Sequence, residues 1–143
     1  MTTTRDPQFD LTQHTVGEVM RLGVVGCSPD TPLSEVARLM SAHRIHCVVV
    51  GGLTEDQHGT RLIWGVVSDL DLARAVAAGQ ELTAGQVAAT EPVTASPFDS
   101  LADVARVMGD HDIAHLVVVD AKDAEPMGVI STLDLARAVA GDA

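Results

Sequence analysis

Two short segments of the sequence carry a glycine, a hydroxyl and a carboxylate at the same spacing. They are Gly-Val-Val-Ser-Asp-Leu-Asp over residues 65–71 and Gly-Val-Ile-Ser-Thr-Leu-Asp over residues 128–134. A glycine lets a ligand approach the backbone closely, and a hydroxyl at the start of a helix lies among N–H groups that favour an anion or a polar group. A carboxylate three residues later can accept two hydrogen bonds from a vicinal diol such as that of ribose. The residues that this chemistry assigns to ligand binding are Gly65, Ser68, Asp71, Gly128, Ser131 and Asp134.

A purely structural interpretation of the same residues stays open. Ser68 and Ser131 are also good N-caps for a helix, and Asp71 and Asp134 would favour the dipole from an early helical position. The two interpretations differ in whether the polar groups face a ligand or only the helix backbone.

An internal repeat relates the two segments. With a shift of 68 residues Thr15 falls on Thr83 and Val50 on Val118, and with a shift of 63 residues 70–77 are identical to residues 133–140. The difference, 68 − 63 = 5, is a longer loop in the first copy. A half of about 65 residues has too little interior to be comfortably stable alone, so we expect the copies to pack as a pseudo-twofold pair. The occurrence of the heptapeptide in both copies favours binding over capping alone.

Hydrophobic periodicity predicts the elements that position these residues. Apolar residues recur at helical spacing from Leu33 and again after Asp69. Short β-branched runs, residues 47–50 and 63–67, predict a pair of strands, and residues 24–27 predict a strand before the first helix. The fold class is therefore α+β, with tandem β-α-β-β-α repeats over residues 14–80 and 81–143 after a tail of residues 1–13.

This order, together with the repeated Gly-x-x-Ser-x-x-Asp element, resembles the CBS domain pair, or Bateman module, in a stand-alone CBS-domain protein. The resemblance implies that the motif hydroxyl contacts phosphate, that the Asp contacts ribose hydroxyls, and that adenine inserts between apolar residues near the first strand and after the first helix. The positions that match the adenine contacts are Val25, Cys27, Ser28, Ile45 and His46 in the first copy and Val93, Ala95, Ser96, Ile113 and Ala114 in the second.

The sequence also departs from the family pattern. The family often has Pro at the positions of Val49 and Val117, and a basic residue just after the motif hydroxyl, where this chain has Asp69 and Thr132. Because the carboxylate of Asp69 opposes a phosphate by about 1 kcal/mol or more, the second copy is expected to be the better phosphate site. AMP, adenosine or S-adenosylmethionine are therefore favoured over ATP as ligands.

Two arginines, Arg74 and Arg137, follow the motif Asp residues by one helical turn. We expect each to form a surface ion pair with that Asp at i to i+3, or alternatively to reach an anionic ligand.

Composition excludes several other functions. The net charge of −11 repels a nucleic-acid backbone, and no apolar run approaches the roughly 20 residues of a membrane span. The N-terminus does not resemble a signal peptide, so a cytoplasmic location is expected, with Cys27 and Cys47 buried and reduced. No metal-ligand spacing or catalytic constellation is present, so neither a metal nor a cofactor is expected to be required.

The function that follows is a non-catalytic regulatory module. It is expected to bind an adenosine-type ligand in the cleft between the two repeats, to form a homodimer through its Ala-rich helices, and to signal to an unidentified protein partner. The alternative is a purely structural dimerisation or interaction module that binds no ligand.

Overall fold

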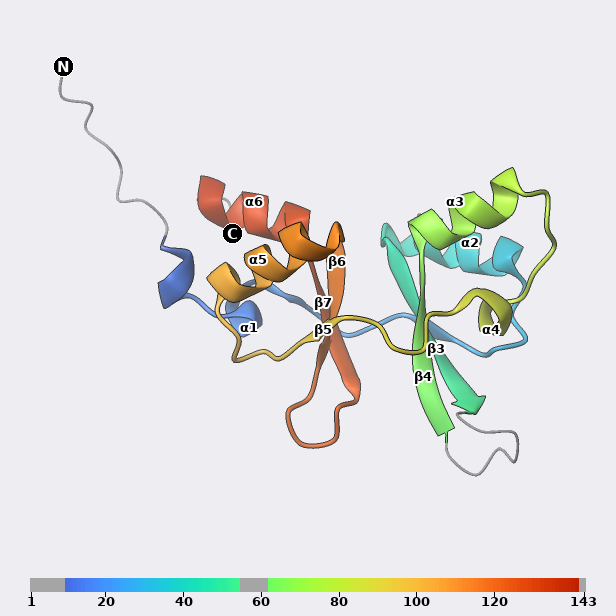
Figure 1. Ribbon diagram of the computed structural model, residues 1–143, viewed down its shortest axis with the longest axis horizontal. Coiled ribbons are helices and arrows are strands. Elements are labelled where there is room, and N and C mark those ends of the chain that lie inside the picture. Colours follow the sequence, from blue (N-terminus) through green and yellow to red (C-terminus); the bar gives the residue numbers. More distant parts are fainter. Residues whose placement is uncertain (1–9, 55–61, 142–143) are drawn as a thin grey trace, which may run out of the picture. The chain divides into compact units, whose positions relative to one another are not determined.

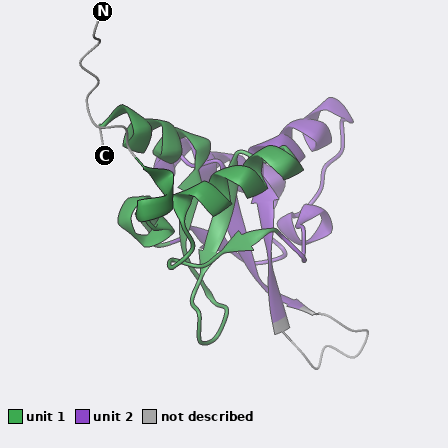
Figure 2. Ribbon diagram, turned by 60° about the vertical axis from the view of Figure 1, so that its left-hand side comes forward, with its two compact units in different colours: residues 1–23, 93–143 green, residues 24–92 purple. Residues whose placement is uncertain are grey.

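Two sheets, each packed against helices, form the protein. A computed structural model describes residues 10–54 and 62–141. The chain divides into two compact units, unit 1 of residues 1–23 and 93–143 and unit 2 of residues 24–92 (Figure 2).

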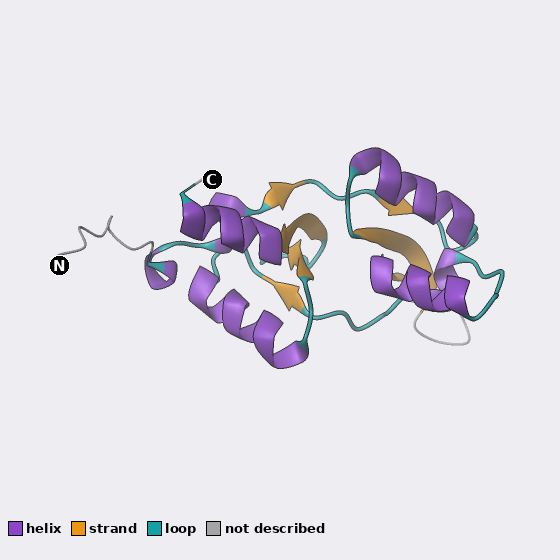
Figure 3. Ribbon diagram, turned by 90° about the horizontal axis from the view of Figure 1, so that it is seen from above, coloured by secondary structure: helices purple, strands orange, loops and turns teal. Residues whose placement is uncertain are grey.

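Unit 2 contains a three-stranded sheet in the order β2-β3-β4, in which β2 runs parallel to β3 and β3 antiparallel to β4. The helices α2 and α3 pack together beside the sheet (Figures 1 and 3). The elements of unit 2 are β2 (Gly26–Cys27), α2 (Leu33–His43), β3 (Cys47–Thr54), β4 (Leu62–Ser68), α3 (Asp69–Ala77) and α4 (Ala84–Val87).

Helical spacing and β-branched runs build the core of unit 2. Leu33, Val36 and Met40 recur every three or four residues and form the buried stripe of α2. Their partners Val48 and Val50 alternate on β3 and are fully buried. Helix α2 ends at His43. The next residue, Arg44, takes a left-handed conformation and begins the turn that leads to β3.

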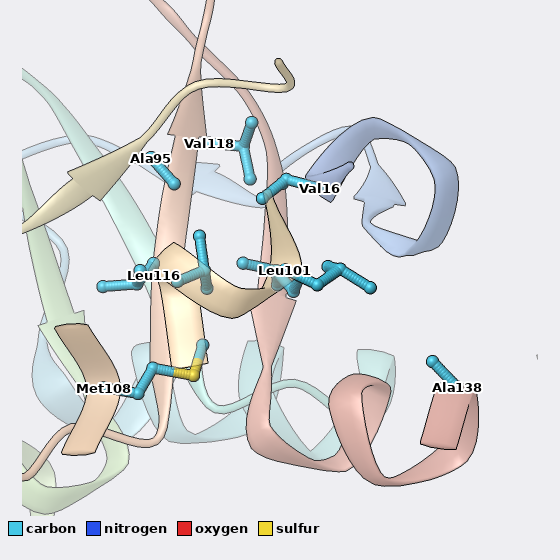
Figure 4. Packing of buried hydrophobic residues seen from close by; sticks show 9 residues of the cluster. Val16, Ala95, Leu101, Met108, Leu116, Val118 and Ala138 are labelled. Atoms are coloured by element: carbon cyan, nitrogen blue, oxygen red, sulfur yellow. The ribbon is translucent and has the colours of Figure 1, made fainter. Parts of the chain in front are cut away.

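Unit 1 repeats this arrangement and adds one strand. Its sheet has the order β1-β7-β6-β5, with β5 parallel to β6 and the other neighbours antiparallel. Figure 4 shows its aliphatic core around Leu101, Leu116 and Val118. The elements of unit 1 are η1 (Leu11–Gln13), α1 (Val16–Val19), β1 (Arg21–Leu22), β5 (Thr94–Ala95), α5 (Leu101–His111), β6 (His115–Val119), β7 (Pro126–Ser131) and α6 (Thr132–Ala140).

The compact units divide the chain differently from the sequence repeats. The start of the first repeat, including α1 and β1, belongs to unit 1, whereas the start of the second, including α4, belongs to unit 2. Arg21 pairs with Val129 of β7, and at the equivalent place in unit 2 Ala89 bridges Val66 of β4. Each unit therefore combines the beginning of one repeat with the strand-helix-strand-strand-helix part of the other.

The structure confirms the predicted α+β fold and the β-α-β-β-α order in both copies. The first strand of each copy is shorter than expected, with two residues in β2 and two in β5. Only these residues pair with the following strand, Gly26 with Val49 and Cys27 with Val50 in unit 2. Among the described residues, no helix is long and apolar enough to cross a membrane.

Candidate functional site

The first motif forms a capping box at the start of α3. The Ser68 N–H donates to Asp71 Oδ2 at 2.9 Å, and the Asp71 N–H donates to Ser68 Oγ at 3.1 Å. Two helix-terminal N–H groups are satisfied in this way. The structural role that the sequence left open is therefore present.

The second motif forms the same capping box at the start of α6, with one more contact. The Ser131 N–H donates to Asp134 Oδ2 at 2.8 Å and the Asp134 N–H to Ser131 Oγ at 3.2 Å. The Ser131 hydroxyl also donates to Asp134 Oδ2, at 3.0 Å. Asp134 is 9% exposed, whereas Asp71 is half-buried, so the first motif is the more open of the two.

Each motif carboxylate keeps one oxygen outside the capping box. Oδ1 of Asp71 and Oδ1 of Asp134 take part in no hydrogen bond among residues 10–54 and 62–141. Because Oδ2 is anchored to the backbone, the direction of Oδ1 is fixed in advance. A carboxylate oxygen with two lone pairs can accept from the hydroxyls of a diol.

The motif glycines are packed against the protein's own backbone. A Cβ at Gly65 would lie 2.7 Å from the carbonyl oxygen of Ala89, and one at Gly128 would clash with the carbonyl oxygen of Arg21. The structure thus gives each glycine a packing role next to the segment contributed by the other repeat. Sequence reasoning missed this role because it considered only the approach of a ligand.

The residue after the first motif serine, Asp69, contacts His46 through both its side chain and its backbone. Asp69 Oδ2 lies 2.9 Å from His46 Nδ1, and the Asp69 N–H donates to the His46 carbonyl at 2.8 Å. In unit 1 the same backbone bond joins Thr132 to Ala114, without charged side chains.

Burial, with a smaller contribution from the nearby Asp69 carboxylate, raises the pKa of the Cys47 thiol to about 11.

A cavity of about 250 Å³ lies beside α3 within unit 2. It is lined by Asp71, Arg74, Ala75, Gln80, Leu82 and Val87. The sequence assigned Asp71 to binding and discussed the arginine. It missed Ala75 of α3, Gln80 and Leu82 of the loop before α4, and Val87 of α4, because none of these residues belongs to the motif.

Neither motif Asp forms the ion pair predicted with the arginine that follows it. The ion pairs at i to i+3 in the described part of the chain are Arg38–Glu35, at 2.7 Å, and Arg106–Asp103, at 3.2 Å. Arg74 and Arg137 have no ion pair among the described residues. Arg74 therefore lines the cavity without an ion-pair partner among the described residues.

Four of the predicted adenine contacts belong to a core or pack against one. Ala95 is buried in the core of unit 1, and Cys27, Ile45 and Ile113 are half-buried and pack against the cores of their units. Val25 is half-buried, and its carbonyl accepts from the Val49 N–H at 2.9 Å.

The other predicted adenine contacts lie nearer the surface of their own units. The Ser28 hydroxyl is exposed and lies 3.2 Å from Thr31 Oγ1. Ser96 Oγ accepts from the Phe98 N–H at 3.2 Å, and Val93 is 37% exposed. None of the predicted adenine contacts lines the cavity beside α3.

The described residues bring together no group of three His, Cys, Asp or Glu side chains that could hold a metal ion.

Comparisons with known proteins relate the whole chain to one family. The CBS domain profile matches residues 16–78 and 84–141. The CBS domain-containing protein YhcV of Bacillus subtilis (strain 168) is 31% identical over 124 residues, which cover 85% of this chain and 82% of that protein. The CBS domain protein PAE2072 from Pyrobaculum aerophilum, solved in complex with AMP, is 31% identical with a TM-score of 0.68, covering 85% of this chain and 89% of that one.

A more distant relative has the same fold. The CBS domain pair of protein MJ0100, solved in complex with 5′-methylthioadenosine and S-adenosyl-L-methionine, matches with a TM-score of 0.75 at 22% identity, over 90% of this chain and 98% of that one. Since the family profile matches both repeats, the chain belongs to the CBS domain family, as a pair of CBS domains.

Proposed function

We propose that this CBS domain pair is a non-catalytic regulatory module that binds an adenosine-type ligand at its Gly-x-x-Ser-x-x-Asp elements. The observation that carries the proposal is the geometry of Asp71 and Asp134, in which one carboxylate oxygen is fixed by the backbone and the other takes part in no hydrogen bond among the described residues. Such an oxygen is a preformed acceptor for ribose hydroxyls. The AMP complex of PAE2072, at 31% identity, supports an adenosine ligand.

The charge around the motifs favours ligands with few phosphates. The first turns of α3 and α6 carry Asp but no basic residue, and the net charge of the chain is −11. A triphosphate needs several cationic partners to offset its charge. AMP, adenosine or S-adenosylmethionine are therefore proposed in preference to ATP.

The proposed contacts with the rest of the ligand follow the family resemblance. Ser68 and Ser131 are assigned to the phosphate or another polar group. Val25, Ser28, Ile45, Val93, Ser96 and Ile113 are assigned to the adenine ring. The proposal also includes that the module acts in the cytoplasm and signals to an unidentified protein partner.

A thermal-shift experiment tests ligand binding. Adenosine, AMP, ATP and S-adenosylmethionine are each added to the wild-type protein and to the Asp71→Ala, Asp134→Ala and Gln86→Ala variants. A ligand at 100 times its dissociation constant adds about 2.7 kcal/mol, which raises the melting temperature by several degrees. Gln86 is the matched control, because its side chain also accepts from the N–H of an N-cap residue, Thr83, at 2.9 Å, but the proposal gives it no ligand contact.

The expected result separates binding from capping. All three variants melt earlier than the wild type, but only Asp71→Ala and Asp134→Ala lose part or all of the ligand-induced shift. If no adenosine compound moves the wild-type midpoint, the binding proposal fails and a structural role remains.

A structural dimerisation module is the second candidate, favoured by apolar side chains on the outer faces of α3 and α6. Leu70 and Val76 are 54% and 70% exposed, and Leu133 and Val139 are 51% and 57% exposed. Monomeric proteins rarely expose large apolar patches unless these mark an interaction site. A homodimer with two-fold symmetry would cover these faces. Light scattering at micromolar concentration should show a dimer that Val76→Glu weakens, and a wild-type monomer would contradict this candidate.

A further inference from the structure

We infer that the cavity beside α3 in unit 2 binds a small monocarboxylic acid with a short apolar tail, and that Arg74 binds its carboxylate. This ligand uses neither Ser68 nor the carboxylate of Asp71. The inference therefore does not rest on the proposed function, and it concerns a second site that is separate in chemistry from the two motifs.

The cavity lies where the last helix of the first repeat meets the beginning of the second repeat. The chain leaves α3 and runs through a loop, residues 78–83, to α4 (Figure 1). Within this loop the Gln80 N–H donates to the Ala75 carbonyl at 3.2 Å. The Leu82 carbonyl accepts from the Leu33 N–H, at the start of α2, at 3.0 Å. Backbone hydrogen bonds therefore hold two walls of the cavity in place before a ligand arrives.

Apolar side chains supply much of the cavity lining. Ala75 is 5% exposed and belongs to the core of unit 2, and Leu82 and Val87 are half-buried and pack against that core. An apolar tail gains free energy by leaving water for such a surface. The volume of about 250 Å³ lies somewhat below the roughly 300 to 1,000 Å³ of pockets for drug-sized ligands. The cavity therefore fits a smaller molecule with a short tail.

The lining also contains one cation and one amide that the protein leaves available. Arg74 and Gln80 are exposed, and their side chains take part in no ion pair or hydrogen bond among the described residues. A guanidinium binds a carboxylate through two parallel hydrogen bonds, and a side-chain amide can donate another. These groups match the carboxylate end of the ligand.

The charges around Arg74 favour a ligand with a single negative charge. Asp71 also lines the cavity, and Glu81 follows Gln80 in the loop. The Ser68 N–H donates to Asp71 Oδ2 at 2.9 Å, which holds this carboxylate at the start of α3, about one helical turn from Arg74. One guanidinium matches a monocarboxylate, whereas the second charge of a phosphate would be opposed by these acids without a further cation in the lining.

The repeat supplies a matched control for Arg74. The helices α3 and α6 are identical over eight residues, and Arg137 is the equivalent of Arg74. The 68-residue repeat shift, however, places His14 where the cavity has the apolar side chain of Leu82. His14 Nδ1 lies 2.7 Å from a Glu18 carboxylate oxygen. A polar side chain thus replaces one apolar wall in unit 1, so the same helix is expected to bind the acid only in unit 2.

Protein NMR titrations of the full chain with a graded set of small acids test the inference. The probes are acetate, butyrate, isocaproate, its neutral analogue isocaproamide, and inorganic phosphate. The amide signals of Gln80, Leu82 and Val87 report on the cavity, and their shifts give the dissociation constants. The variants are Arg74→Gln and its control Arg137→Gln, both at exposed positions, and melting curves without ligand check that each variant is folded.

Isocaproate should shift the amide signals of the cavity residues, and affinity should rise by about fourfold for each carbon added between acetate and isocaproate. Isocaproamide should bind about tenfold or more weakly than isocaproate, because the charge-assisted hydrogen bonds are lost. Arg74→Gln should weaken isocaproate binding by a similar factor, whereas Arg137→Gln should leave it unchanged. Phosphate should bind more weakly than isocaproate.

Several results would overturn the inference. If the cavity signals do not shift at about 10 mM isocaproate, a concentration at which a well-matched ligand of this size should bind, the cavity does not take the acid. Equal binding of isocaproamide, equal losses in Arg74→Gln and Arg137→Gln, or phosphate binding as tight as that of isocaproate each remove the role of Arg74. An affinity that does not rise with tail length removes the role of the apolar walls.

Discussion

Replacing Gly65 by Ala tests which neighbour requires a glycine in the first motif. A Cβ at this position would lie 2.7 Å from the Ala89 carbonyl oxygen and 3.0 Å from Leu53 Cδ1. The carbonyl oxygen cannot retreat freely, because Ala89 and Val66 exchange two backbone hydrogen bonds, both of 2.9 Å. The substitution must therefore push the segment around Ala89, which comes from the second repeat, away from β4.

The expected cost has two parts. Overpacking of a filled site costs about 1 to 3 kcal/mol, and loss of the two hydrogen bonds costs about 1 kcal/mol each. The sum, about 3 to 5 kcal/mol, is a large fraction of the roughly 5 to 15 kcal/mol by which a domain is stable. Unit 2 of the variant should be strongly destabilised without any ligand present.

Urea denaturation followed by tryptophan fluorescence measures this cost. Trp64 is the single tryptophan and precedes the substituted residue on β4, so its emission reports on unit 2. Gly51→Ala, on β3, is the matched control, because a Cβ there would meet no atom within 4 Å. The control should stay within about 0.5 kcal/mol of the wild type. Equal unfolding midpoints for the two variants would refute the packing role, and lost adenosine binding at unchanged stability would restore the role in ligand approach.

Three further predictions concern stability. The pKa of Cys47, about 11 against 9.0 for an ordinary thiol, means that the folded state holds this proton more tightly, so the unfolding free energy should fall by about 2 kcal/mol as the pH rises from 9 to 11. The chain has no tyrosine to mask this fall, and urea titrations of Cys47→Ala, which should keep only the part that comes from the raised pKa of Cys27, provide the check. Ala124→Gly should raise the unfolding free energy by about 0.5 to 1 kcal/mol, because Ala124 has a φ of 57°; an unchanged urea midpoint would contradict this. Ser100→Ala should lower the melting temperature through the loss of about 1 kcal/mol, since Ser100 Oγ accepts from the Asp103 N–H at 3.1 Å, and calorimetry at neutral pH measures the change.

The fold could be predicted because short stretches of sequence indicate its helices and strands, and the same pattern occurs in both repeats. The period of Leu33, Val36 and Met40 identifies a helix, and the valine run of β3 identifies a strand, in each case without tertiary information. The exchange of segments between the units was not predictable in this way. Strand β1 has only two residues, and hydrophobic periodicity in so short a segment does not say which sheet it joins.

Two glycines, Gly65 and Gly128, were the sequence feature that indicated this exchange of segments. Gly65 and Gly128 occupy equivalent positions, and each faces a carbonyl oxygen of a segment from the other repeat. From the sequence alone, close approach of a ligand and close approach of a backbone make the same demand on a residue. Only the placement of Ala89 and Arg21 distinguishes them.

The failure of the predicted Arg74–Asp71 ion pair has a specific cause. In Asp71 the carboxylate is turned back toward the start of α3 by the Ser68 N–H, so it points away from the next turn. Asp103 has the same position relative to its N-cap serine, but no hydrogen bond from the N-cap N–H holds its carboxylate among the described residues, and it pairs with Arg106 at 3.2 Å. In this chain the acids that pair with an arginine three residues later, Glu35 and Asp103, accept no hydrogen bond from an N-cap N–H among the described residues, whereas Asp71 and Asp134 do.

Capping and binding are consequently not exclusive roles for the motif. The capping box uses Oδ2 of Asp71 and fixes the direction of Oδ1, and a group that is held in place before the ligand arrives loses less entropy on binding. A residue of this kind stabilises the free protein and the complex together, so a loss of stability in Asp71→Ala does not argue against binding. The decisive quantity is the ligand-dependent part of the melting shift. Gln86→Ala loses a side-chain capping hydrogen bond alone, and comparison with it separates the two contributions.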